Sequence, residues 1–235
     1  MGAKRLKIAD VVRDAEINRN TVNEIPPWEI PEVRISRTSL QGKKDTITDE
    51  QLKQDFLQRI NDIGEEGTHF YTDGSLLGDG RAGCGVVSYT GGKEVDTLSR
   101  RISEDCPITQ AELLGIVAAL SLARKTAGNV VIASDSLSAL QSLTADKAVQ
   151  NILVRRALSL IARHHNQGRQ VSFIWTPSHC SIIGNERADE LAKKGALKNK
   201  IDYSFPPSIT KLKESVGKEI LEKYKTRIFT ISVQN

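Results

Sequence analysis

The sequence predicts an α/β protein in which helices flank a mixed five-stranded sheet. From residue 68 onward, strand-like runs and helical periods follow one another in the order β β β α β α α β α. Three consecutive strands with no helix between them should pair antiparallel, whereas strands separated by helices favour parallel crossovers. The 235 residues, of which 39% are hydrophobic, are enough for one such domain with extensions.

The first three strands form the antiparallel part of the predicted sheet. Thr68–Thr72 is expected to be a strand that ends at the turn-forming residues 73–75. Cys84–Thr90 and Lys93–Ile102 are expected to form a hairpin, because the glycine pair between them suits a tight turn.

The last two strands are expected to be parallel. Val130–Ala133 is an unbroken apolar run, which is typical of a strand covered on both faces, and Val171–Thr176 is the next strand, stopped by Pro177. The helices are expected over residues 107–125, 134–143, 149–165 and 185–194. Asn185 is the expected cap of the last helix.

The first 67 residues are predicted to be an extension or connector. Residues 8–17 can form a short helix, whereas the prolines of Pro26–Pro31 exclude one. Thr48 and Gln51 match a capping box, which predicts a helix that begins there and runs toward Ile63.

The C-terminal extension, residues 198–235, is the basic part of the chain. Residues 190–235 carry an excess of Lys and Arg over Asp and Glu, and a helix is expected at 208–226. This region can contact phosphates or present a solvated helical face, and the charge pattern leaves both open. The net charge of +4 is compatible with a nucleic-acid partner but does not require one. The predicted domain therefore spans residues 68–197.

Composition also indicates a compartment. No apolar run approaches the roughly 18–20 residues of a membrane span, so no membrane partner is expected. Cys84, Cys106 and Cys180 provide neither a disulfide framework nor a zinc ligand set, which favours a reducing compartment. We expect an intracellular, soluble monomer in the nucleus or cytoplasm.

Four carboxylates stand at the ends of predicted elements: Asp73, Glu112, Asp135 and Asp189. Each has a structural alternative. Asp135 can cap a helix, Asp73 can be a turn residue, Glu112 can favour a helix dipole, and Asp189 can pair with Lys193. Together at one edge of a sheet they would raise one another's pKa values unless a cation compensates. A site made of carboxylates suits Mg²⁺ or Mn²⁺ rather than zinc.

A glycine pattern at Gly78–Gly83 matches the dinucleotide-binding fingerprint. That fingerprint requires a helix directly after it, and here a strand follows. We therefore interpret these glycines as a hairpin loop.

Four motifs follow one another along the chain: Phe70–Ser75, Gln110–Leu114, Ala133–Ser136 and Pro177–Asp189. Their sequences and order resemble those of type 1 ribonuclease H, specifically the ribonuclease H domain of non-LTR retrotransposon reverse-transcriptase polyproteins. The resemblance covers about residues 68–197, and it implies a ribonuclease H-like fold. The Pro26–Pro31 segment also resembles the connector that precedes this domain in such polyproteins.

The resemblance implies an activity. The enzyme would hydrolyse the RNA strand of an RNA/DNA hybrid and leave 3′-hydroxyl and 5′-phosphate ends. Two Mg²⁺ ions, with Mn²⁺ as an alternative, would act at the site. Asp73 would bridge both ions, Glu112 and Asp135 would hold the ion near the attacking water, and Asp189 would complete the other. His179 would help the product or a proton to leave.

The resemblance also implies substrate contacts and departures from the family pattern. Gly74, Ser75, Ser136 and Asn185 are the expected contacts to the hybrid. Three differences stand out. Ser181 and Ile183 occupy positions where relatives often have Gly and Pro, Ile108-Thr109 replaces amide-bearing residues, and no basic protrusion is visible between residues 144 and 170.

Two other functions remain open at this point: a hybrid-binding domain without activity, and a recombinase or transposase of the same broad fold. Four intact acids argue against the first, and the segment from His179 to Asp189 argues against the second. The chain carries no Tyr-x-Asp-Asp polymerase signature, so a reverse-transcriptase domain of a longer polyprotein is the implied partner.

Overall fold

The computed structural model describes residues 31–40, 47–64, 67–104, 106–144 and 151–205, together with residues 217, 220, 221 and 224. The described residues from 31 to 204 belong to one compact unit, and those from Phe205 onward belong to a second. The helix expected at 8–17 lies outside the described residues. Of the helix expected at 208–226, four residues are described, and their backbone is helical.

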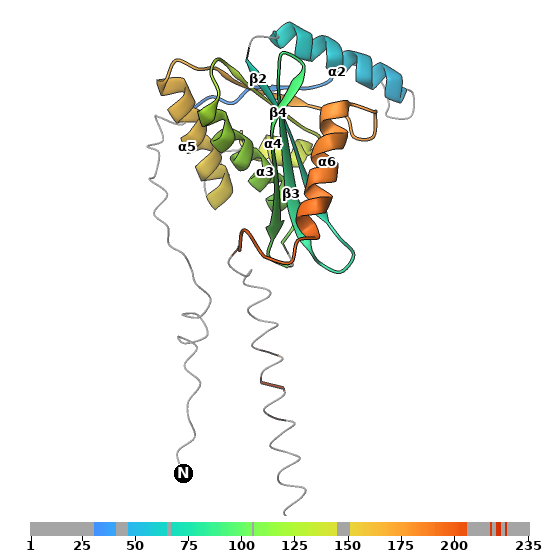
Figure 1. Cartoon of the computed structure of the whole chain (residues 1–235), viewed down its shortest axis with the longest axis vertical. Coiled ribbons are helices and arrows are strands. Elements are labelled where there is room, and N and C mark those ends of the chain that lie inside the picture. Colours follow the sequence, from blue (N-terminus) through green and yellow to red (C-terminus); the bar gives the residue numbers. More distant parts are fainter. Residues whose placement is uncertain are drawn as a thin grey trace, which may run out of the picture. The chain divides into compact units, whose positions relative to one another are not determined.

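A mixed sheet forms the centre of the first unit (Figure 1). It has six strands in the order β1-β6-β5-β2-β3-β4. The strands are β1 Ile35–Ser36, β2 Thr68–Leu76, β3 Ala82–Thr90, β4 Lys93–Ile102, β5 Val130–Ser134 and β6 Val171–Trp175. β2, β3 and β4 pair antiparallel, and β1, β6, β5 and β2 pair parallel. The predicted fold class is confirmed, with one strand more than expected.

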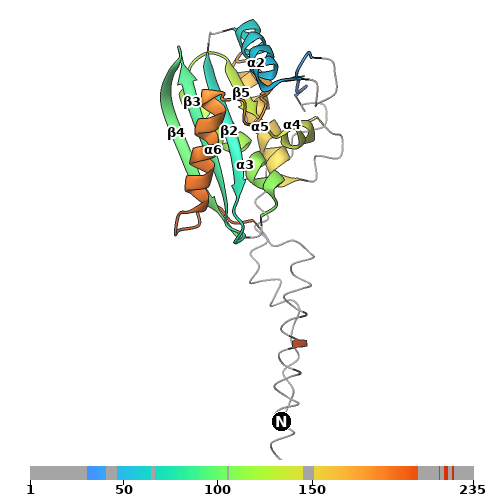
Figure 2. The same cartoon turned by 90° about the vertical axis from the view of Figure 1, so that its right-hand side faces the viewer.

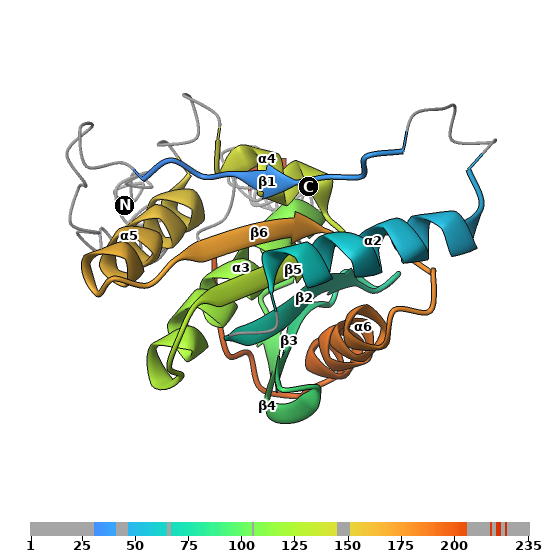
Figure 3. The same cartoon turned by 90° about the horizontal axis from the view of Figure 1, so that it is seen from above.

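Helices cover both faces of this sheet. They are α2 Asp49–Ile63, α3 Ile108–Leu122, α4 Leu137–Ser142, α5 Ile152–Asn166 and α6 Ile183–Ala196, and a short 3₁₀ helix, Ala123–Lys125, follows α3. Seen from above, α2 and α6 lie on one side of the sheet, and α3, α4 and α5 lie on the other (Figure 3). Within the described part of the chain, no helix combines the length and the apolar character needed to cross a membrane.

The first long strand continues past the point where the sequence predicted its end. β2 runs to Leu76, and Asp73, Gly74 and Ser75 pair with residues of β3 instead of forming a turn. The prediction was wrong because Asp-Gly-Ser suits a turn locally, whereas pairing with β3 satisfies the backbone of these residues within the sheet. Asp73 is therefore held on a paired strand.

α6 approaches the sheet very closely across β2 and β3 (Figure 2). A side chain at Gly83 would collide with the backbone of Ala192 and Ala196, and one at Gly85 would collide with the backbone of Ala188. Gly83 is the last glycine of the dinucleotide-like pattern, and its place in the fold is this helix contact. The sheet surface lacks side chains here, and this allows α6 to bring its residues close to β2.

Residues that the sequence placed in the N-terminal extension contribute to the same compact unit. α2 begins with the predicted capping box, in which Thr48 Oγ1 accepts from the Gln51 backbone N–H at 3.2 Å and the Gln51 side chain accepts from the Thr48 backbone N–H at 2.8 Å. Phe56 of α2 is fully buried against β5 and β6. The segment from β1 to α2 is thus packed onto the sheet.

Candidate active site

Three of the four predicted acids meet at one edge of the sheet. Asp73 lies on β2, Glu112 lies in the first turns of α3, and Asp135 directly follows β5. One carboxylate oxygen from each lies within 4.8 Å of the other two. β2 and β5 are parallel neighbours in which Thr72 faces Ser134, so the next residue along each strand is an acid of the group.

Gly74 allows Glu112 to join this group. A Cβ at position 74 would lie 2.7 Å from the Glu112 backbone nitrogen and 3.0 Å from the Ala111 carbonyl carbon. A side chain would therefore push α3 away from β2. The backbone N–H of Gly74 also lowers the pKa of both Asp73 and Glu112, although other effects outweigh it.

Burial and the charges of neighbouring carboxylates make Asp73 and Glu112 reluctant to ionise. Asp73 is 7% exposed and Glu112 is 6% exposed. Burial raises the pKa of Asp73 to about 7, assisted by the charges of Asp135 and Asp189. Burial also raises the pKa of Glu112 to about 9, assisted by Asp73 and Asp135. A cation among them would relieve both the repulsion and the loss of hydration.

One buried oxygen of the group fits a metal ligand. Glu112 Oε2 has no hydrogen-bond partner among the described residues, although it is inaccessible to water. An unpaired buried carboxylate oxygen is costly, and coordination to a cation would satisfy it. The donor set is all oxygen, which suits Mg²⁺ or Mn²⁺.

The Asp135 carboxylate is oriented by two neutral donors. Ser178 Oγ donates to Asp135 Oδ2 at 2.9 Å, and the Asn185 amide donates to the same oxygen at 3.4 Å. The Trp175 indole N–H donates to the backbone carbonyl of Asp135 at 3.1 Å. Both the carboxylate and the backbone carbonyl of Asp135 accept hydrogen bonds, and no basic side chain among the described residues forms a salt bridge with it.

Asp189 lies next to this group but outside it. Its negative charge contributes to the raised pKa of Asp73, so the two carboxylates are close. Asp189 Oδ2, however, accepts from Lys193 Nζ at 2.6 Å, the i, i+4 ion pair that the sequence allowed as an alternative. The positive charge of Lys193 also lowers the pKa of Asp73.

His179 is exposed on the loop between β6 and α6. Its φ is 59°, and Ser181 on the same loop has a φ of 53°. Both residues adopt the left-handed backbone that glycine favours, at a cost of roughly 1–2 kcal/mol each. Ser181 thus has a glycine-like backbone at the position where the family resemblance implies Gly.

One predicted cap and one alternative capping role differ from the structure. The cap of α6 is Ile182, so Asn185 lies inside the first turn and its amide is directed to Asp135. The helix begins at Ile183, earlier than expected. The cap of α4 is Ser136, whose Oγ accepts from the Ala139 N–H at 3.4 Å. Asp135 is therefore not the cap.

The structure adds three residues to the site that sequence reasoning left out: Ser178, Lys193 and Trp175. Ser178 directly precedes His179 and lies inside the Pro177–Asp189 motif, and this position was the signal that could have found it. Lys193 was considered only as a partner of Asp189, and Trp175 only as part of the strand expected over residues 171–176. Of the predicted substrate contacts, Ser75 is buried, and Gly74 is in contact with α3.

Comparison with known proteins gives the family. The RNase H family model matches residues 65–197. Ribonuclease H of Schizosaccharomyces pombe is 32% identical over 146 residues, which are 54% of this chain and 52% of that protein. Ribonuclease H of Methylobacillus flagellatus is 32% identical over 147 residues, which are 53% of this chain and 88% of that protein.

Among solved structures, prototype foamy virus protease–reverse transcriptase aligns with 21% identity and a TM-score of 0.48, over 57% of this chain and 21% of that one. This chain thus spans about half the length of the fission-yeast relative and about a fifth of the viral chain. The family match covers more than half of the present sequence and includes all four predicted acids. The chain belongs to the RNase H family.

Proposed function

We propose that this protein is an endoribonuclease that hydrolyses the RNA strand of RNA/DNA hybrids. Membership of the RNase H family supports the proposal, as do relatives described as ribonuclease H. The observation that carries it is the group of Asp73, Glu112 and Asp135, with one Glu112 oxygen buried and unpaired. Such a group suits phosphodiester chemistry that depends on divalent ions.

The proposed ligands for two Mg²⁺ ions are Asp73, Glu112, Asp135 and Asp189, with Mn²⁺ as an alternative. When bound, two such ions activate water and stabilise the charge on the leaving oxygen. Asp189 would join the ligands by exchanging Lys193 for a cation. The Ser178 and Asn185 donors would keep Asp135 in one orientation while substrate arrives.

The remaining chemistry concerns protons and water. The protein surroundings of Asp73 and Glu112 exclude bulk water from the acids, which strengthens electrostatic interactions in the site. His179 is exposed on the loop whose Ser178 donates to Asp135, and we propose that its imidazole carries a proton for the departing 3′-oxygen. The products would carry 3′-hydroxyl and 5′-phosphate ends.

The hybrid would be recognised by groove shape and 2′-hydroxyl groups, since an A-like duplex presents these rather than a readable base code. Gly74, Ser75, Ser136 and Asn185 are the proposed contacts near the scissile strand. Ser136 and Asn185 also hold local structure, so their substitution would affect both the fold and binding.

The order of the four motifs supports a non-LTR retrotransposon polyprotein as the proposed source, with a reverse-transcriptase domain as partner. The proposed working location is the nucleus or cytoplasm, and the proposed state is a monomer.

The test is digestion of a labelled RNA/DNA hybrid by the full chain with Mg²⁺. We expect cleavage that stops with chelator and with Asp73→Asn, while circular dichroism shows an unchanged fold. Duplex RNA and duplex DNA are the controls. Binding of the hybrid without cleavage would overturn the proposal in favour of a binding domain. Cleavage of duplex DNA instead of the hybrid would favour a recombinase.

A further inference from the structure

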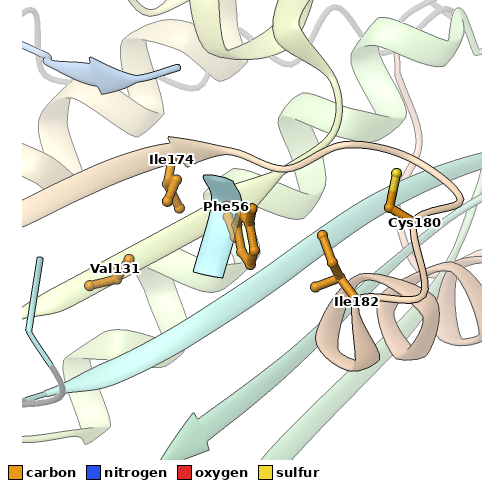
Figure 4. Packing of buried hydrophobic residues seen from close by; sticks show 6 residues of the cluster. Phe56, Val131, Ile174, Cys180 and Ile182 are labelled. Carbon is orange, nitrogen blue, oxygen red and sulfur yellow. The ribbon is translucent and has the colours of Figure 1, made fainter. Parts of the chain in front are cut away.

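A segment that precedes the family match contacts the loop of His179. We name β1 (Ile35–Ser36) and α2 (Asp49–Ile63) together the N-terminal brace; both lie before residue 65, where the family match begins. Phe56 of the brace is fully buried in one hydrophobic cluster (Figure 4). The other buried members of this cluster are Val131, Ala133, Ile174, Cys180 and Ile182.

Two of these cluster members belong to the His179 loop. Cys180 and Ile182 alternate along the chain with His179 and Ser181, the two described non-glycine residues with positive φ. Cys180 and Ile182 are buried in the same cluster as Phe56, whereas His179 and Ser181 are exposed. A loop with two left-handed residues persists only where its surroundings hold it, and the brace supplies part of that packing.

An electrostatic interaction joins the same elements. Burial raises the pKa of the Cys180 thiol, and the nearby carboxylate of Asp49, the first residue of α2, raises it further. The brace thus meets the loop through the apolar cluster of Phe56 and through the charge of Asp49.

A second route leads from the brace to a predicted metal ligand. Arg59 is almost fully buried, and its Nη1 donates to the Ser36 carbonyl at 3.2 Å and to the Trp175 carbonyl at 3.1 Å. Asp55 Oδ2 accepts from Arg59 Nε at 2.8 Å and fixes the guanidinium. The Trp175 indole in turn donates to the Asp135 carbonyl at 3.1 Å.

We propose that the N-terminal brace is a positioning element of the active site: it holds the His179 loop through Phe56, Cys180 and Ile182, and Asp135 through Arg59 and Trp175. The catalytic part of this inference rests on the proposed function. The brace touches no reacting group itself, so Phe56 and Arg59 are positioning residues. When a catalytic group is displaced by about 1 Å, the reaction rate can fall by up to about a hundredfold.

The first test uses Phe56→Leu in the full chain, since leucine keeps an apolar side chain at this site. Leu57→Ala is the matched control, because Leu57 is the adjacent apolar residue of α2 and is 42% exposed. We expect Phe56→Leu to speed backbone hydrogen exchange at residues 178–182 by about tenfold, with exchange in α5 unchanged. The control should leave both regions unchanged. Equal exchange of residues 178–182 in wild type and Phe56→Leu would overturn the proposal.

Activity then separates positioning from stability. We expect Phe56→Leu to lower kcat about tenfold with KM within about twofold. In a His179→Ala background, the same substitution should cause no further loss, because the residue through which it acts is gone. An undiminished additional loss in that background would contradict the route through His179.

The second route is tested by magnesium binding. Trp175→Phe removes the indole donor and keeps an aromatic ring, and Arg59→Met removes the guanidinium; Arg156→Met, at an exposed arginine of α5, is the control. We expect the first two to weaken Mg²⁺ binding about tenfold, as loss of outer-shell contacts does, and the control to leave it unchanged. Unchanged Mg²⁺ affinity in Trp175→Phe would overturn this route.

Failure of the proposed function is distinguishable from failure of this inference. If the wild type cleaves no hybrid, that result contradicts the proposed function alone. The hydrogen-exchange measurement still decides whether the brace holds the loop.

Discussion

Asp135 and Asp189 have the same side chain and are both predicted metal ligands, but their neighbours differ. Asp135 receives hydrogen bonds from the neutral donors Ser178 and Asn185, whereas Asp189 is paired with the cation of Lys193. Neutral donors orient a carboxylate without cancelling its charge, and a lysine does cancel it. Asp135 is therefore ready to bind a cation, and Asp189 must first give up a partner.

This comparison predicts unequal effects of the two amide substitutions. We expect Asp135→Asn to lower hybrid cleavage by about 10²–10³-fold, since it removes a charge from the centre of the site. We expect Asp189→Asn to lower it only about tenfold. Single-turnover cleavage at saturating Mg²⁺ measures both. Equal losses would show that the lysine pairing of Asp189 has no functional consequence.

The acids of the central group should destabilise the metal-free fold. Because the folded-state pKa of Asp73 is raised from 3.8 to about 7, the folded protein binds its proton more tightly than the unfolded chain does. The free energy of unfolding therefore falls as the pH rises through this interval, and it stays lower above pH 7. We expect Asp73→Asn to raise it at pH 8 by about 1–3 kcal/mol in chelator.

Urea unfolding with chelator at pH 4 and at pH 8 measures this effect. The gain from Asp73→Asn should shrink at pH 4, where the native carboxyl is protonated, and it should also shrink with Mg²⁺ at pH 8. A variant less stable than wild type at pH 8 without metal would contradict the expected repulsion.

The His179 loop, which lies between Asp135 and Asp189 in the sequence, has backbone strain at Ser181. Glycine adopts a φ of 53° without the steric penalty that serine has, so Ser181→Gly should raise the free energy of unfolding by about 0.5–1 kcal/mol. Ser204→Gly is the control, because Ser204 is exposed and has no positive φ. Thermal unfolding of both variants checks this, and a loss of stability in Ser181→Gly would indicate a native contact of the serine that outweighs the strain.

The smallest expected effect is at Lys193. Removal of this cation by Lys193→Met leaves Asp189 unpaired and available, so Mg²⁺ should bind about two- to fivefold more tightly at low salt. Lys194→Met is the control, since Lys194 is the adjacent exposed lysine of α6. Weaker binding in Lys193→Met would mean that the lysine supports the site instead of competing with metal.

The sequence was sufficient to predict what depends on local patterns. The hairpin of β3 and β4, the buried strand β5 and the capping box of α2 follow from turn residues, apolar runs and a four-residue motif, and each is present. The meeting of Asp73, Glu112 and Asp135 was predicted from motif order together with the family resemblance. The structure brings these three together.

Features that depend on distant contacts were not predictable in this way. β1 has only two residues, too few for a periodic pattern, and it exists because β6 offers it a partner. The docking of α2 depends on Phe56 meeting residues that are up to 126 positions away. Asn185 was predicted to cap the last helix because asparagine is a common cap in local sequence patterns. Its side chain instead donates to Asp135, which follows β5 and is distant in the sequence.

The account depends most on a divalent cation held by the group that contains Glu112. Calorimetric titration of the full chain with Mg²⁺, compared with a titration of Glu112→Gln, tests it most directly. The wild type should bind Mg²⁺, and the variant should lose most of that binding, because its unpaired buried oxygen is part of an amide instead of a carboxylate. The absence of Mg²⁺ binding by the folded wild type, or equal binding by both proteins, would contradict the account.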